Sequence, residues 1–183
     1  LVDAANGELL SFEDTNHYAT SRVVQGGVLP ETNDGVGPEG TEQPGWPMPF
    51  TDVVNAGDTL FTDAGGNLLA CVDGEITTTL SGRYMSMNDN CGAISESTTG
   101  DVLDLGLSAT TDCSVPPGAS PGNTRSSRSG YYEMNRIQEQ ARGQLPANSW
   151  LQDQLIANMN INNFCNALWN GEVNFYSSGG ACG

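Results

Sequence analysis

The last third of the chain decides its fold, and residues 165–176 read Cys-Asn-Ala-Leu-Trp-Asn-Gly-Glu-Val-Asn-Phe-Tyr. The Asn170-Gly171 pair favours a tight hairpin turn, because both residue types tolerate positive φ. The turn would join a strand at 167–169 to a second strand at 173–176. Just upstream, residues 155–162 alternate apolar side chains with mostly asparagine, the pattern of a half-buried strand. We therefore expect a strand followed by a hairpin.

A helix is expected immediately before this strand. Apolar side chains recur there at steps of three and four, which defines one face of a helix. They are Tyr131, Met134, Ile137, Ala141 and Leu145. Gly143 and Pro146 predict its end.

The first two thirds of the chain are expected to be β-rich. Asn6-Gly7 predicts a hairpin within 2–12, and similar turn chemistry recurs within 62–72. Residues 27–50 are rich in Gly and Pro and are predicted to form a long surface loop. Short candidate strands follow at 59–62, 68–72, 75–80, 83–87 and 102–107. The predicted fold class is α+β and predominantly β: a β-rich N-terminal region, then a helix and an antiparallel edge hairpin.

Charge divides the chain unevenly. The 183 residues carry 22 acidic and six basic side chains, a net charge of −16, and every basic residue is arginine. Residues 1–121 hold 18 acidic groups against Arg22 and Arg83, whereas 122–183 hold four acidic groups and four arginines. This step falls in a Pro- and Gly-rich stretch at 116–122, which is typical of a loop. We place the main domain boundary between residues 121 and 122.

The same charge excludes two classes of partner. Nucleic acid and anionic membranes both require a basic patch, and no apolar run is long enough to span a bilayer. No signal segment begins the chain, so we expect any export signal to have been removed. We predict a secreted, extracellular protein with neither nucleic acid nor membrane as a partner.

The five cysteines support the same localisation. Their spacing contains no C-x-x-C pair, which argues against a zinc knuckle, so structural disulfides in an exported protein are the better interpretation. Cys165 and Cys182 bracket the predicted hairpin and are expected to pair across it. Cys71, Cys91 and Cys113 would then supply one bridge and one unpaired thiol.

The stretch at 165–176 resembles the Asn-Ala-Phe-Trp-Asn-Gly edge strand of thermolysin-like and fungalysin-like zinc metallopeptidases. In that family the strand lies above the catalytic zinc and holds the substrate peptide as an added strand. The resemblance implies that Asn166 and Ala167 bind substrate and that Trp169 anchors the strand, while Leu168 replaces the family's usual Phe. The helix at 130–136 is similar to the family's helix before this sheet.

The resemblance also organises the rest of the chain. Residues 1–10 look like the last hairpin of the propeptide domain that precedes such peptidases. The implied domains are a propeptide-like terminal hairpin at 1–20, an acidic β-rich region at 21–121, and a segment of the thermolysin-like N-terminal subdomain at 122–183.

The family's catalytic motif is missing. Its H-E-x-x-H helix supplies two zinc-binding histidines and a general base, whereas His17 is the only histidine here and is expected on the surface. The chain stops about where relatives run on toward that helix. We therefore expect a part of a peptidase that is inactive alone, with no catalytic residue, metal ligand or cofactor of its own. Zinc belongs only to the full-length relative, and the missing C-terminal half is a possible partner.

Two alternatives remain open. A non-catalytic extracellular structural or filament module, retaining a peptidase-like scaffold, would assemble through exposed edge strands. A calcium-binding module would use carboxylates, which calcium prefers, but no EF-hand spacing is present and a solvated acidic surface is the better interpretation. The candidate calcium ligands are Asp58, Asp63, Asp73, Asp89, Asp101 and Asp104.

Overall fold

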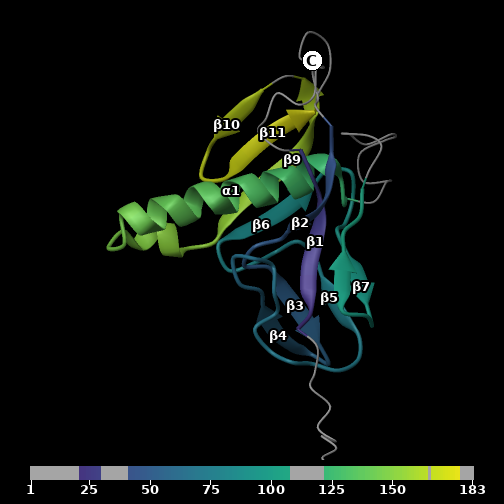
Figure 1. Ribbon diagram of the computed structural model, residues 1–183. Coiled ribbons are helices and arrows are strands. Elements are labelled where there is room, and N and C mark those ends of the chain that lie inside the picture. The colour runs from purple at the N-terminus through teal and green to yellow at the C-terminus, as the bar shows by residue number, and fades with distance from the viewer. Residues whose placement is uncertain (1–20, 30–40, 108–121, 165, 178–183) are drawn as a thin grey trace, which may run out of the picture.

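The computed structural model describes residues 21–29, 41–107, 122–164 and 166–177 (Figure 1). Within them the chain is dominated by strands, with one long helix after a strand-rich region, so the predicted fold class is confirmed. No helix in these residues is long and apolar enough to cross a membrane. The elements are β1 (Val23–Val28), β2 (Gln43–Pro47), β3 (Asp52–Asn55), β4 (Asp58–Phe61), β5 (Ile76–Thr78), β6 (Met85–Asp89), β7 (Glu96–Thr98), β8 (Val102–Asp104), α1 (Arg125–Gln144), a 3-10 helix η1 (Ser149–Gln152), β9 (Leu155–Phe164), β10 (Ala167–Trp169) and β11 (Val173–Ser177).

The described strands form three sheets. Their orders are β2-β1-β8, β10-β11-β9-β6 and β4-β3-β5-β7. In Figure 1, α1 crosses the second sheet, with β10 and β11 above the helix and β3 and β4 below it. The predicted hairpin is confirmed as the antiparallel pair β10–β11, and the predicted strand at 155–162 is confirmed within β9.

Strand β9 pairs with one strand from the acidic region 1–121 and with one from the neutral region 122–183. It pairs in parallel with β11 on one side and with β6 on the other, so a strand of the acidic region completes the C-terminal sheet. A single core cluster also contains residues from both regions, including Val24, Ile76, Tyr131 and Met159. Described residues from both sides of the composition step therefore share one core cluster.

Two local predictions in the acidic region were wrong. Gln43–Pro47, inside the predicted loop at 27–50, forms β2 and pairs with β1. Proline lacks the N–H that an interior strand needs, but β2 lies at a sheet edge, where proline is tolerated. The predicted strand at 68–72 is absent, because the chain there makes only a single bridge between Thr62 and Leu68.

Helix α1 begins at Arg125, six residues before the first residue of its apolar pattern, Tyr131. Thr124 caps it by accepting a hydrogen bond from the backbone N–H of Ser127 (3.2 Å). The predicted apolar face is only partly buried: Tyr131 is inaccessible to solvent, whereas Ile137 is 60% exposed. Part of the buried face is instead polar and includes Arg128 and Asn135. The helix is therefore oriented so that polar as well as apolar side chains are buried.

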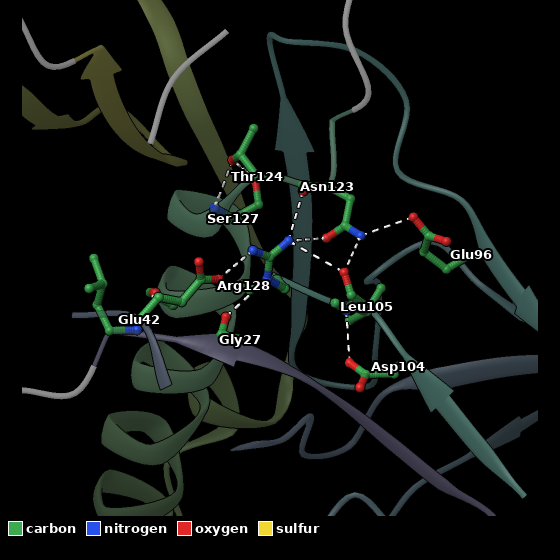
Figure 2. Close-up of polar contacts among 12 residues, drawn as sticks. Gly27, Glu42, Glu96, Asp104, Leu105, Asn123, Thr124, Ser127 and Arg128 are labelled. Atoms are coloured by element: carbon green, nitrogen blue, oxygen red, sulfur yellow. Dashed lines mark hydrogen bonds and ion pairs between the residues drawn. The ribbon is translucent and has the colours of Figure 1, made fainter. Parts of the chain in front are cut away.

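Arg128 explains this orientation (Figure 2). Its side chain is 1% exposed and forms an ion pair with Glu42 at 2.5 Å. Its Nε donates to the carbonyl of Gly27 on β1 (3.0 Å), and its Nη1 donates to Asn123 just before α1 (2.8 Å). The Asn123 amide in turn donates to the carbonyl of Leu105 (2.6 Å). The guanidinium of Arg128 thus joins the helix to β1, and it reaches Leu105, which follows β8, through Asn123.

A second polar cluster fixes α1 to the other sheet. The carboxylate of Asp89, at the end of β6, accepts hydrogen bonds from the hydroxyls of Thr124 (2.6 Å) and Ser127 (2.5 Å). It also accepts from the amide of Asn160 on β9 (3.0 Å). Asn160 has a positive φ of 55°, and the pairing of β9 with β11 shifts register near this residue. The cluster therefore holds helix, β6 and β9 together where β9 is irregular.

Replacing Arg128 by Met tests the first cluster. The substitution removes the cation but keeps an apolar stem, so that the buried acceptors and the Glu42 carboxylate lose their contacts with Arg128. We expect a loss of about 3–5 kcal/mol of unfolding free energy, measured by urea denaturation. The matched control is Arg136→Met on the same helix, where the arginine is 52% exposed and lies 3.8 Å from Glu133; it should cost less than about 1 kcal/mol. Equal losses for the two variants would contradict this role of Arg128.

Candidate functional site

Strand β10 forms one edge of the sheet β10-β11-β9-β6, and the three residues Ala167–Trp169 are all exposed. The carbonyl of Asn166 accepts a hydrogen bond from the N–H of Tyr176 (3.0 Å), and the N–H of Asn170 donates to the carbonyl of Glu172 (3.3 Å). Backbone groups of antiparallel strands alternate between facing the partner and facing away. Those of Ala167 and Trp169 therefore point outward, and no other described strand pairs with this edge.

Two of the predicted substrate-binding residues lie at the start of this edge. The side-chain oxygen of Asn166 accepts a hydrogen bond from the outward N–H of Ala167 (2.9 Å). This local hydrogen bond already orients the Asn166 amide. An incoming strand would meet the Asn166 amide together with the carbonyl of Ala167.

The third predicted residue, Trp169, contacts a side chain that the sequence analysis missed. Its ring is 55% exposed and meets Trp150 of η1 edge-on, with ring centroids 6.1 Å apart and an interplanar angle of 80°. Trp150 also lines a groove of about 250 Å³ between α1 and the sheet, together with Met134, Ile137, Gln138, Ala141, Leu151, Leu155 and Val173. Trp169 therefore packs sideways against η1, beside an apolar groove.

A row of amides supports the hairpin from the face opposite α1. The amide of Asn158 on β9 donates to the carboxylate of Glu172 (2.7 Å) and to the amide oxygen of Asn174 (3.1 Å). Asn174 donates in turn to the side-chain oxygen of Asn170 (2.9 Å), and Asn88 on β6 donates to Asn158 (3.2 Å). The alternating asparagines of β9 thus take part in a hydrogen-bonded row that reaches from β6 to the hairpin turn.

The described residues contain no group of three or more His, Cys, Asp or Glu side chains that could hold a metal ion. Asp63 instead organises its own turn by accepting hydrogen bonds from the N–H groups of Gly65 and Asn67 (both 2.8 Å). Slight burial raises the pKa of Asp63, but the hydrogen bonds from Asn67 and Gly65 outweigh burial and lower the pKa below its usual value. Calcium binding stays a prediction, as does zinc in a full-length relative.

Of the cysteines, Cys91 is fully buried and Cys71 is exposed. Cys113, Cys165 and Cys182 lie outside the described residues, as does His17. The expected pairing of Cys165 with Cys182 therefore stays a prediction.

The contact between Trp150 and Trp169 can be tested by a double-mutant cycle. We expect Trp150→Ala, Trp169→Ala and the double variant to give a coupling energy of about 0.5–1.5 kcal/mol in urea denaturation, because edge-to-face aromatic pairs contribute about that much beyond their buried area. Either single variant should also remove the near-ultraviolet dichroism of the coupled rings. Additive losses would show that Trp169 does not support β10 through Trp150.

Comparison with known proteins found no matching family model, no matching curated protein and no matching solved structure.

Proposed function

We propose that this chain binds an extended polypeptide by strand addition at β10, as the N-terminal portion of an exported protein that resembles thermolysin-like metallopeptidases. The observation that carries the proposal is the outward orientation of the backbone groups of Ala167 and Trp169 at an exposed sheet edge. The family resemblance of residues 165–176 supports a peptide substrate. The chain would supply the substrate-binding edge but not the zinc site.

The geometry suits an extended ligand. Residues two apart on a strand are separated by about 6.6–6.8 Å, which is also the repeat of a second extended chain. A peptide lying beside β10 would hydrogen-bond to Ala167 and again to Trp169. Main-chain hydrogen bonds of this kind give affinity with little sequence preference, and side chains beside the edge add specificity.

Asn166 would complete the binding edge. A side-chain amide carries one acceptor oxygen and two N–H donors, and the oxygen of Asn166 already accepts from Ala167. The N–H donors of the amide suit a peptide carbonyl that lies beyond the last outward group of β10. Asn166 would therefore extend the row of hydrogen-bonding groups by one position.

Two features support export. The five cysteines suit structural disulfides, which persist in oxidising compartments and are rare in the cytosol. The chain also carries a net charge of −16, which favours solubility of an isolated exported protein.

The same edge supports a second candidate, a non-catalytic structural module that assembles with copies of itself. Leu168 is 36% exposed and Trp169 is 55% exposed, so the edge carries none of the charged side chains with which strands usually prevent pairing. Strand addition between two chains would cover both the apolar side chains and the backbone groups. The ligand would then be a second copy rather than a substrate.

Replacing Ala167 by proline tests strand addition. The substitution removes the outward N–H, whereas sheet edges tolerate proline, so folding should be retained. The probe is a set of fluorescein-labelled ten-residue peptides with a central Val, Leu or Phe, followed by fluorescence anisotropy. We expect Ala167→Pro to weaken binding at least tenfold, because the proline ring hinders approach to the edge and the missing N–H no longer orients the Asn166 amide toward the peptide.

The control is Thr59→Pro on β4, another edge strand. A two-residue turn with positive φ at Ala56 and Gly57 closes the pair Asn55–Asp58, so the backbone of Thr59 faces outward. Thr59→Pro should leave peptide binding unchanged. No peptide binding by the native chain, or equal binding by both variants, would refute the proposal. Sedimentation that shows oligomers lost only in Ala167→Pro would instead support the assembly module.

A further inference from the structure

The turn between β10 and β11 places Asn170 before Gly171 at an exposed position. Gly171 has a φ of 106°, and a Cβ at this glycine would meet no atom within 4 Å. Because glycine has no side chain, residue 171 itself carries no group that would shield its backbone nitrogen. No other asparagine in the described part of the chain precedes a glycine.

We propose that Asn170 is a site of spontaneous deamidation, and that the folded hairpin promotes the reaction. The backbone nitrogen of Gly171 loses its proton to hydroxide and attacks the Cγ of Asn170. A C–N bond forms, the Cγ–Nδ2 bond breaks, and ammonia leaves from a five-membered succinimide. Water then opens the ring at Cγ to give aspartate, or at the main-chain carbonyl to give isoaspartate. The net change is an amide plus water to a carboxylate plus ammonium.

The fold contributes two hydrogen bonds to the reacting carbonyl. The Oδ1 of Asn170 accepts from the Nδ2 of Asn174 (2.9 Å) and from the backbone N–H of Glu172 (3.4 Å). When the nitrogen of Gly171 attacks, negative charge develops on this oxygen, and donors already aimed at it stabilise that charge. The arrangement acts on Asn170 as an oxyanion hole acts on an acyl substrate.

The main donor is itself held in place. Asn174 is 8% exposed, and its own amide oxygen accepts a hydrogen bond from Asn158 (3.1 Å). Asn158 also donates to the carboxylate of Glu172 (2.7 Å), which fixes the other end of the turn. The amide of Asn174 cannot turn away from Asn170 without breaking this row, so the donor is pre-organised.

Both products change the hairpin. Conversion of Asn170 to aspartate replaces a neutral amide by a carboxylate two residues before Glu172. Isoaspartate inserts a methylene into the backbone at the turn that sets the pairing of Trp169 with Val173. Because hairpin register depends on the turn, the isoaspartate form should alter the edge of β10. The reaction would proceed whether or not β10 binds a peptide.

Incubation of the folded chain at mildly alkaline pH, followed by cleavage before aspartate residues, tests the proposal. Asp153 is the last aspartate, so unmodified chain gives one C-terminal fragment from Asp153 to Gly183. Conversion of Asn170 to aspartate creates a new cleavage site, whereas isoaspartate raises the fragment mass by about one dalton without cleavage. We expect both products at Asn170, forming faster as pH rises. No modification at Asn170, while Asn6 in the same chain reacts, would overturn the proposal.

Two variants test the role of the fold. Asn174→Ala removes the donor and should slow deamidation at Asn170 at least several-fold, whereas Leu168→Ala, on the neighbouring strand, should not change the rate. An unchanged rate in Asn174→Ala would overturn promotion by the hairpin. If Asn174→Ala does not fold, deamidation of the native chain is compared in buffer and in urea. Slower deamidation of the folded chain would also overturn promotion by the hairpin. Gly171→Ala shields the nitrogen and should suppress the reaction in either state.

Discussion

The buried guanidinium of Arg128 is the interaction on which the arrangement of this chain depends. A buried arginine is stable only when its donors find acceptors, and here the acceptors come from β1, from Asn123 and from Glu42. Arginine suits this position better than lysine, because its planar group carries several donors in fixed directions. The result is a helix whose rotation is set by polar partners, even where this leaves the apolar Ile137 exposed.

That helix in turn positions the candidate binding edge. Asp89 receives hydrogen bonds from the first turn of α1 and from Asn160, so helix, β6 and β9 meet at one carboxylate. Strand β9 then supports β11, and β11 supports β10. The position of the exposed edge thus depends on buried charged groups that lie on other elements. Its short length is consistent with this dependence, because a three-residue strand has little stability of its own.

The sequence predicted those elements whose structure depends on neighbouring residues. The Asn170-Gly171 turn, the alternation in β9 and the end of α1 all follow from neighbouring residues. Strand β2 was missed because its prolines resemble loop residues, and only a sheet edge makes them acceptable. The rotation of α1 was also missed, since the acceptors of Arg128 include Gly27, 101 residues away. For the site, the sequence placed Asn166, Ala167 and Trp169 on an edge strand, but Trp150 and the outward backbone groups require the register and the packing of η1.

The parallel pairing of β9 with β6 has a consequence for how the chain acquires its structure. Asn88 and Asn158, neighbours in this pairing, are 70 residues apart in sequence. Contacts so distant must overcome a large loop-closure entropy and form slowly. During synthesis, β6 emerges long before its partner and cannot complete the sheet. The hairpin at 167–177 can close on its own within microseconds, yet it has no sheet to join until β9 has met β6. We therefore expect assembly of the C-terminal sheet to limit the folding rate of the described chain.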